Sequence, residues 1–186
     1  IMRSSRMNQD RAQATPELGI VIPCFDEEAV LPTLFAELTR FAQSVPGKVW
    51  FLLVDDGSRD RTLEIATDIA RADDRVMVVN FRRNYGQTPA MAAGIEQANG
   101  RVLVTMDGDL QNDPRDIEHF LAKIGEGYDI VVGWRHDRQD KLVSRKIPSK
   151  IANWIIGKVT GVPIKDNGCS LKAYRAELIK AIPLYS

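Results

Sequence analysis

Two aspartates separated by one glycine are the strongest chemical signal in this 186-residue sequence. Asp107-Gly108-Asp109 follows the apolar residues 102–106, a run that is typical of a buried strand. Carboxylates two residues apart lie on the same side of an extended segment, and they repel each other unless a cation lies between them. Their oxygens suit Mg²⁺ or Mn²⁺. The pattern favours a divalent-metal site; the alternative is an ordinary turn before a helix.

Two other expected strands also run into acidic residues. Residues 18–23 lead to Glu27, and residues 49–54 lead to Asp55 and Asp56. Open α/β sheets bind ligands at the carboxyl ends of their strands, so we expect these acidic ends on one rim. Helix N-termini account for some of them. Such a rim accepts a nucleotide if carboxylates take the donors of base and ribose while a metal carries the diphosphate.

The elements that must position these residues follow from hydrophobic periodicity. Apolar runs predict strands at residues 18–23, 49–54, 76–79, 102–106 and 129–133. Helical spacing predicts helices over residues 27–42, 60–71, 88–98, 114–125, 148–159 and 171–182. Continuous apolar strands that alternate with amphipathic helices indicate an α/β fold, a mostly parallel sheet flanked by helices on both faces. We expect one domain over residues 17–186, preceded by a disordered leader at residues 1–16.

Composition excludes several classes of protein. The formal net charge is zero, which does not indicate a nucleic-acid partner. Cys24 and Cys169 are too few for a disulfide framework, and two histidines are too few for a histidine-rich zinc site. No apolar run spans a bilayer, and no signal peptide is visible. The phosphate-binding glycine motifs of dinucleotide and P-loop enzymes and the Gly-x-Ser-x-Gly elbow of serine hydrolases are absent.

A basic segment follows the fifth expected strand. Residues 134–150 contain six basic and two acidic residues. A solvated charged loop is the ordinary explanation of such a run, but its place beside the acidic rim favours a function. The helix expected around Trp154 either packs on the sheet or lies on a membrane surface.

Four motifs in this order resemble the family-two glycosyltransferases of GT-A (Rossmann-like) fold, over about residues 17–182. They are Pro23-Cys24-Phe25-Asp26-Glu27-Glu28, Val54-Asp55-Asp56-Gly57-Ser58, Asn84-Tyr85-Gly86-Gln87 and Asp107-Gly108-Asp109-Leu110-Gln111. Residues 145–153 and 166–175 add a closer likeness to polyprenyl-phosphate glycosyltransferases. Dolichyl-phosphate mannose synthase, the bactoprenol glucosyltransferases and the undecaprenyl-phosphate formamido-arabinose transferase are of this type.

The resemblance implies a role for each matching residue. It implies that the nucleotide sugar is bound by Pro23, Phe25, Glu27, Asp55, Asp56, Gln87, Asp107 and Gly108. It implies that Asp107, Asp109 and Gln111 hold Mg²⁺ or Mn²⁺, and that Arg135, Arg145 and Ser149 bind an acceptor phosphate. Asp107, Asp109 and Arg145 are the catalytic residues under this interpretation.

The implied reaction is metal-dependent, inverting transfer of a sugar from a UDP- or GDP-sugar to a polyprenyl phosphate. The metal stabilises the leaving diphosphate, and the acceptor phosphate is already ionised, so it needs positioning by cations rather than a general base. The expected place is the cytoplasmic face of the membrane, in cell-envelope glycan biosynthesis, and a homo-oligomeric state is left open.

Two alternatives remain. An enzyme acting on a saccharide hydroxyl needs a carboxylate base downstream, for which only the isolated Asp166 and Glu177 follow Asp140. A nucleotide-sugar-binding module without catalysis is the other alternative.

Overall fold

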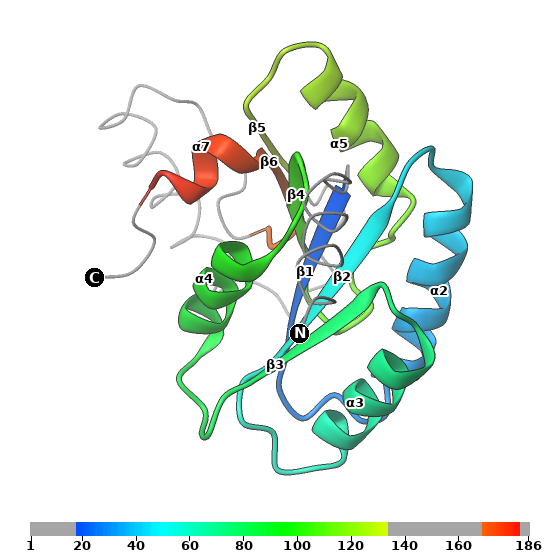
Figure 1. Ribbon diagram of the computed structural model, residues 1–186, viewed down its shortest axis with the longest axis vertical. Helices are drawn as coiled ribbons and strands as arrows, with labels where there is room; N and C mark the ends of the chain where they lie inside the picture. Colours follow the sequence, from blue (N-terminus) through cyan, green and yellow to red (C-terminus); the bar gives the residue numbers. More distant parts are fainter. Residues whose placement is uncertain (1–17, 134–168, 183–186) are drawn as a thin grey trace, which may run out of the picture.

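A six-stranded sheet organises the chain in the computed structural model, which describes residues 18–133 and 169–182 (Figure 1). Its strands are β1 (Leu18–Cys24), β2 (Val49–Asp55), β3 (Val76–Asn80), β4 (Val102–Thr105), β5 (Ile130–Val132) and β6 (Lys172–Arg175). The helices are α2 (Leu31–Ser44), α3 (Thr62–Ala72), α4 (Gln87–Gln97), α5 (Asp116–Gly125) and α7 (Ala176–Lys180). The strand order is β3-β2-β1-β4-β6-β5.

The first four strands form a parallel block in which β1 pairs with β2 and with β4, and β2 pairs with β3. Every residue of β1 is buried. A strand covered on both faces must be apolar throughout, which explains its continuous run of apolar residues. The block therefore has one rim at which β1, β2 and β4 all end.

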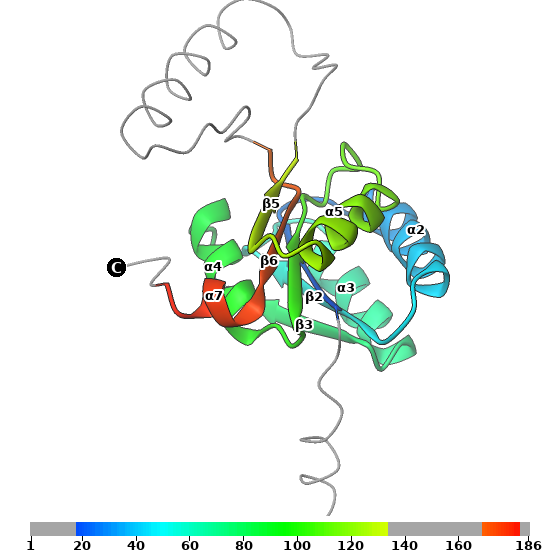
Figure 2. The same cartoon turned by 90° about the horizontal axis from the view of Figure 1, so that it is seen from above.

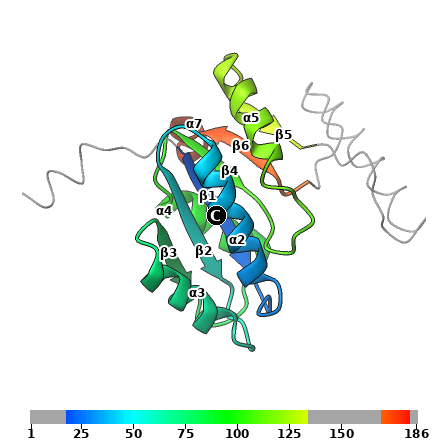
Figure 3. The ribbon, with the colours of Figure 1, turned by 90° about the vertical axis from the view of Figure 1, so that its right-hand side faces the viewer.

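Helices cover both faces of the sheet, as the sequence predicts. Alternate residues of β1 pack in opposite directions: Ile20 and Ile22 face the cluster that contains α2, α3 and α5, while Val21 faces α4 and α7. Figure 2 shows α4 and α7 on one side of the sheet and α2 and α5 on the other. Along the sheet, α5 lies beside β5 and β6, and α3 lies beside β3 at the opposite edge (Figure 3).

Helix α4 approaches the sheet more closely than a larger residue would permit. A Cβ atom added to Gly94 would lie 2.3 Å from Cγ1 of Val21, and Ala90 on the same face is fully buried. The small residues of this helix are therefore a packing requirement.

The five predicted strands and the first four predicted helices are confirmed, with shifts of a few residues at their ends. The helix predicted over residues 171–182 is wrong, because residues 172–175 form β6 and only residues 176–180 are helical. The reason is tertiary: β6 pairs antiparallel with both β4 and β5, which places Ala173 opposite Val104 and Val131.

The expected leader at residues 1–16 and the expected helix at residues 148–159 lie outside the described residues. Within the part of the chain that the structure describes, no helix is long and apolar enough to cross a membrane.

Candidate functional site

The loops that follow β1 and β4 touch at the rim of the parallel block. A Cβ atom added to Gly108 would lie 3.3 Å from the carbonyl oxygen of Pro23 and 3.8 Å from Cγ of Glu27. The loop after β2 joins them, because the Asp56 backbone N–H donates to the Cys24 carbonyl at 2.9 Å. The prediction that three acidic strand ends share one rim is therefore confirmed.

The negative charges at this rim act on one another. The pKa of the Glu27 carboxyl is raised, first by burial and then by the charges of Asp109, Asp60, Asp107 and Asp26. A carboxyl whose pKa is raised by its neighbours marks a place where a cation would be favourable. The half-buried Asp107 and Asp109 offer the oxygens that Mg²⁺ and Mn²⁺ prefer.

These carboxylates do not form a closed metal cage. Among the described residues, no group of three or more His, Cys, Asp or Glu side chains is placed to hold a metal ion. Mg²⁺ is commonly bound by one or two carboxylates together with substrate phosphates and water. Asp107 and Asp109 therefore fit a metal that a bound diphosphate helps to hold.

The turn after Asp109 is held in an unusual backbone conformation. Leu110 has φ of 59°, in the left-handed region that residues other than glycine seldom adopt. The Gln111 backbone N–H donates to Oδ1 of Asp109 at 3.1 Å, which fixes that carboxylate within the turn. The side chain of Gln111 is exposed, and its role as a metal ligand stays a prediction.

Asp56 fixes the loop that leads into α4. It is 3% exposed, and its two carboxylate oxygens accept the backbone N–H groups of Tyr85 and Gly86, both at 2.8 Å. Gly86 has φ of 98°, a conformation that suits glycine. The predicted role of Asp56 as a nucleotide ligand thus competes with hydrogen bonds that position the Asn84-Tyr85-Gly86-Gln87 motif.

Asp55 differs from its neighbour. It is 2% exposed, and its Oδ2 accepts the Ser58 backbone N–H at 3.2 Å. Its Oδ1 is buried and has no hydrogen-bond partner among the described residues. Buried carboxylate oxygens are normally satisfied, so Asp55 is the better of the two to accept a donor from a ligand.

Gln87 links α4 to the Asp-Gly-Asp motif. It is the first residue of α4, and its Nε2 donates to Oδ1 of Asp107. A cavity of about 390 Å³ adjoins both residues, between α4, β4, β6 and α7. The donor motifs singled out in the sequence are therefore neighbours in space.

Three polar residues to which the sequence analysis gave no role at the site hold the loop after β1. The backbone N–H groups of residues 26, 27 and 28 donate to Ser58 Oγ, Thr62 Oγ1 and Asp60 Oδ2, at 3.0, 2.7 and 3.1 Å. Polar side chains that follow the Asp55-Asp56 pair at short intervals were the available signal. They explain why this loop keeps one shape at the rim.

Of the remaining residues named in the sequence analysis, those of the first motif lie at the rim and those of the acceptor side are not described by the structure. Pro23 lies in β1 and Phe25 is 37% exposed at the rim. Burial, followed by the charges of Glu27 and Asp55, raises the pKa of the Cys24 thiol to about 12, so the thiol stays protonated. Arg135, Arg145, Ser149 and Asp166 lie outside the described residues.

Sequence comparison finds a family and longer relatives. The model of glycosyl transferase family 2 matches residues 19–182. The chain is 46% identical over 170 residues to the dodecaprenyl-phosphate galacturonate synthase of Rhizobium johnstonii, covering 90% of this chain and 50% of that protein. It is 42% identical over 166 residues to the undecaprenyl-phosphate 4-deoxy-4-formamido-L-arabinose transferase of Shewanella sediminis, covering 89% and 50%. The chain thus spans about half the length of these relatives.

Structural comparison confirms the predicted fold. Glucosyl-3-phosphoglycerate synthase from Mycobacterium tuberculosis, solved with Mn²⁺, UDP and glucosyl-3-phosphoglycerate, superposes with a TM-score of 0.67 at 20% identity, over 96% of this chain and 63% of that one. The S. aureus TarS 1–349 structure with UDP-GlcNAc gives 0.62 at 19% identity, over 89% and 47%. These neighbours have the GT-A fold, the one expected from the sequence.

Proposed function

This chain belongs to glycosyl transferase family 2, and from that premise we propose that it transfers a sugar from a nucleotide sugar to a polyprenyl phosphate. The observation that carries the proposal is the convergence of Asp107, Asp109 and Glu27 at the rim. These carboxylates can bind a divalent cation, and the cation can in turn bind the diphosphate of a nucleotide sugar. The product is a polyprenyl-monophosphate sugar, formed with inversion as the family resemblance implies.

In the donor half of the site, Asp107 and Asp109 would hold Mg²⁺ or Mn²⁺. When bound, the metal supplies the positive charge that stabilises the leaving nucleoside diphosphate. Gln87 orients the Asp107 carboxylate through its amide. Asp55 accepts an N–H donor of the base with its buried Oδ1, and we take UDP as the nucleotide.

The acceptor half needs no proton-abstracting base. A phosphate monoester is ionised near neutral pH, so its oxygen is already a nucleophile and requires only alignment with the sugar. We assign this alignment to Arg135, Arg145 and Ser149. The polyprenyl-phosphate substrates named for both curated relatives support this assignment. The enzyme would act at the cytoplasmic face of the membrane.

A binding panel and a product assay test the proposal. The chain is mixed with UDP, UDP-sugars or GDP-sugars, with Mn²⁺ or with EDTA, and the Tm is measured. We expect UDP-sugars to raise the Tm by several degrees only when Mn²⁺ is present, because ligands that bind the folded state stabilise it. With undecaprenyl phosphate added, the expected product is a lipid-linked sugar monophosphate.

Substitutions at the rim sharpen this test. Asp109→Asn should remove the Mn²⁺-dependent shift, whereas Asp68→Asn, on the exposed face of α3, should retain it. Absence of any shift with both nucleotides in Mn²⁺ contradicts the donor assignment. Transfer to a saccharide hydroxyl that requires Asp166, with none to undecaprenyl phosphate, contradicts the acceptor assignment.

A further inference from the structure

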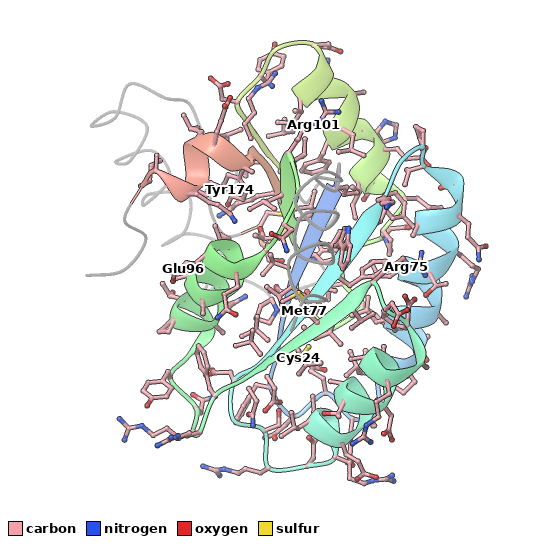
Figure 4. The ribbon with its side chains drawn as sticks, viewed as in Figure 1. Cys24, Arg75, Met77, Glu96, Arg101 and Tyr174 are labelled. Carbon is pink, nitrogen blue, oxygen red and sulfur yellow. The ribbon has the colours of Figure 1, made fainter. Side chains whose placement is uncertain are left out.

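The cavity beside Asp107 lies on the face of the sheet that α4 and α7 cover. Asp107 and Gln87 form part of its wall, and β6 contributes Lys172 and Tyr174. Figure 4 shows Tyr174 on the side of the sheet that carries these two helices. The cavity has a volume of about 390 Å³, which is ample for one hexose ring.

Sheet pairing places Lys172 close to the Asp-Gly-Asp motif. Lys172 is the partner of Thr105 in the antiparallel pairing of β6 with β4. Side chains of paired residues lie on the same face, with Cβ atoms roughly 5 Å apart. Asp107 follows Thr105 by two residues, and all three side chains line the cavity. The β6 strand thus brings an ammonium group to the donor side of the site.

The wall of the cavity has the composition of a sugar site. Hydroxyl groups come from Thr88, Thr105, Ser170 and Tyr174, while Met91 and Ile95 of α4 supply apolar surface. Burial raises the pKa of Tyr174, so its hydroxyl remains a protonated donor. A hexose ring offers both hydroxyl groups and apolar C–H surface, which matches this mixture. Among the described lining residues, Lys172 is the one cation.

We propose that this cavity is the sugar subsite of the donor and that it takes a uronic acid, whose carboxylate pairs with the ammonium of Lys172. The proposal rests on the proposed glycosyltransferase function and specifies its sugar. A sugar carboxylate that lies beside the ammonium of Lys172 would make a charge-assisted hydrogen bond with it.

Binding measurements on the chain in Mn²⁺ test the proposal, with UDP, UDP-galactose and UDP-galacturonic acid as probes, and with the glucose and glucuronic acid pair in parallel. We expect a uronic acid donor to bind about tenfold more tightly than its neutral counterpart, since charge-assisted hydrogen bonds are the strong ones. Lys172→Gln should abolish this preference and leave the Kd of UDP unchanged. Lys172→Arg should keep most of it, and Lys123→Gln, on the exposed face of α5, should keep all of it.

The remaining outcomes each decide against the proposal in a distinguishable way. Equal affinity for the acidic and neutral donors overturns it. A Lys172→Gln variant that loses affinity for UDP itself assigns Lys172 to the diphosphate instead. A variant with unchanged donor binding but a raised KM for undecaprenyl phosphate assigns Lys172 to the acceptor phosphate. If UDP fails to bind the unaltered chain, the proposed function itself falls.

Discussion

Asp55 and Asp56 are adjacent in sequence, but their carboxylates belong to different parts of the site. Successive residues at the end of a strand point to opposite faces of the sheet. Asp55 therefore lies towards Ser58, whereas Asp56 lies towards the loop before α4. Both carboxylate oxygens of Asp56 accept backbone N–H groups of the protein itself. Asp55 has one oxygen, Oδ1, without a partner among the described residues, and this oxygen can accept a donor from a ligand.

Substitution of this pair should separate stability from binding. Asp56→Ala leaves the N–H groups of Tyr85 and Gly86 without their acceptor, and we expect a loss of about 2 kcal/mol in the free energy of unfolding. Asp55→Asn retains an oxygen for Ser58, so we expect a change below about 1 kcal/mol but a Kd for UDP about tenfold weaker. Chemical denaturation and calorimetric titration measure the two quantities. Equal effects of both variants on stability would contradict the division of roles.

Glu27 makes stability depend on pH. Its pKa is raised in the folded protein, so the folded state binds more protons than the unfolded state between the two pKa values. Stability contributed by the protonated carboxyl is complete below the unfolded value of 4.5 and is lost as pH rises through the folded value. Glu27→Gln should raise the Tm in EDTA by about 2 °C at pH 8 and leave it unchanged at pH 4.

The control for this effect is Glu96→Gln, on the exposed surface of α4. Burial, the first cause of the raised pKa of Glu27, is unaffected by a cation, but Mn²⁺ with UDP should reduce the benefit of Glu27→Gln, since a cation at Asp107 and Asp109 offsets the repulsion that adds to it. A benefit that is the same at pH 4 and pH 8 would show that ionisation of Glu27 is not its cause.

At the scale of elements, α4 couples the core to the site. Gly94 allows its contact with Val21 of β1, and Gln87 at its first turn holds Asp107. Displacement of this helix therefore changes both the packing of the sheet and the position of the Asp-Gly-Asp motif.

Gly94→Ala tests that coupling. The added methyl group meets Val21, and overpacking of this kind typically costs about 1–3 kcal/mol, more than the helix propensity that alanine gains. Gly125→Ala, in α5, meets no atom within 4 Å and should be neutral or slightly stabilising. Thermal unfolding with and without UDP and Mn²⁺ measures both effects. Gly94→Ala with unchanged Tm and unchanged UDP affinity would refute the coupling.

The sequence predicts the elements whose local pattern agrees with their place in the fold. The strands β1, β2 and β4 are continuous apolar runs because both of their faces are buried. The sequence of β6 is Lys-Ala-Tyr-Arg, which is not a continuous apolar run. This segment forms a strand because it pairs with β4 on one side and with β5 on the other. The common rim was predictable from parallel topology, whereas Lys172 was missed because it was assigned to a helix.

At the scale of the whole molecule, the proposed site has a donor half and an acceptor half that lie in different parts of the chain. The donor half comes from the described residues between Pro23 and Asp109, together with β6. The acceptor half is assigned to Arg135, Arg145 and Ser149, which lie outside the described residues.

Arg145→Ala should therefore affect one substrate alone. Loss of a charged phosphate contact should raise the KM for undecaprenyl phosphate about tenfold or more, with no change in the Kd of UDP. Steady-state kinetics with varied acceptor, together with titration of UDP, measure both quantities. Arg138→Ala is the matched control from the same basic segment. A weakened UDP affinity in Arg145→Ala would place this residue in the donor half.

The antiparallel pairing of β5 and β6 brings two distant points of the chain together. The backbone N–H of Gly133 donates to the carbonyl of Leu171 at 2.9 Å, and a Cβ atom on Gly133 would lie 2.7 Å from Sγ of Cys169. The chain thus departs from the sheet and returns to it at one place. The free energy of closing a loop depends only weakly on its length. The stretch between Gly133 and Cys169 can therefore change in length at little cost to the stability of the sheet. Under the proposed assignment of Arg135, Arg145 and Ser149 to the acceptor phosphate, a change of acceptor would require substitutions in this stretch alone and would leave the nucleotide-binding rim as it is.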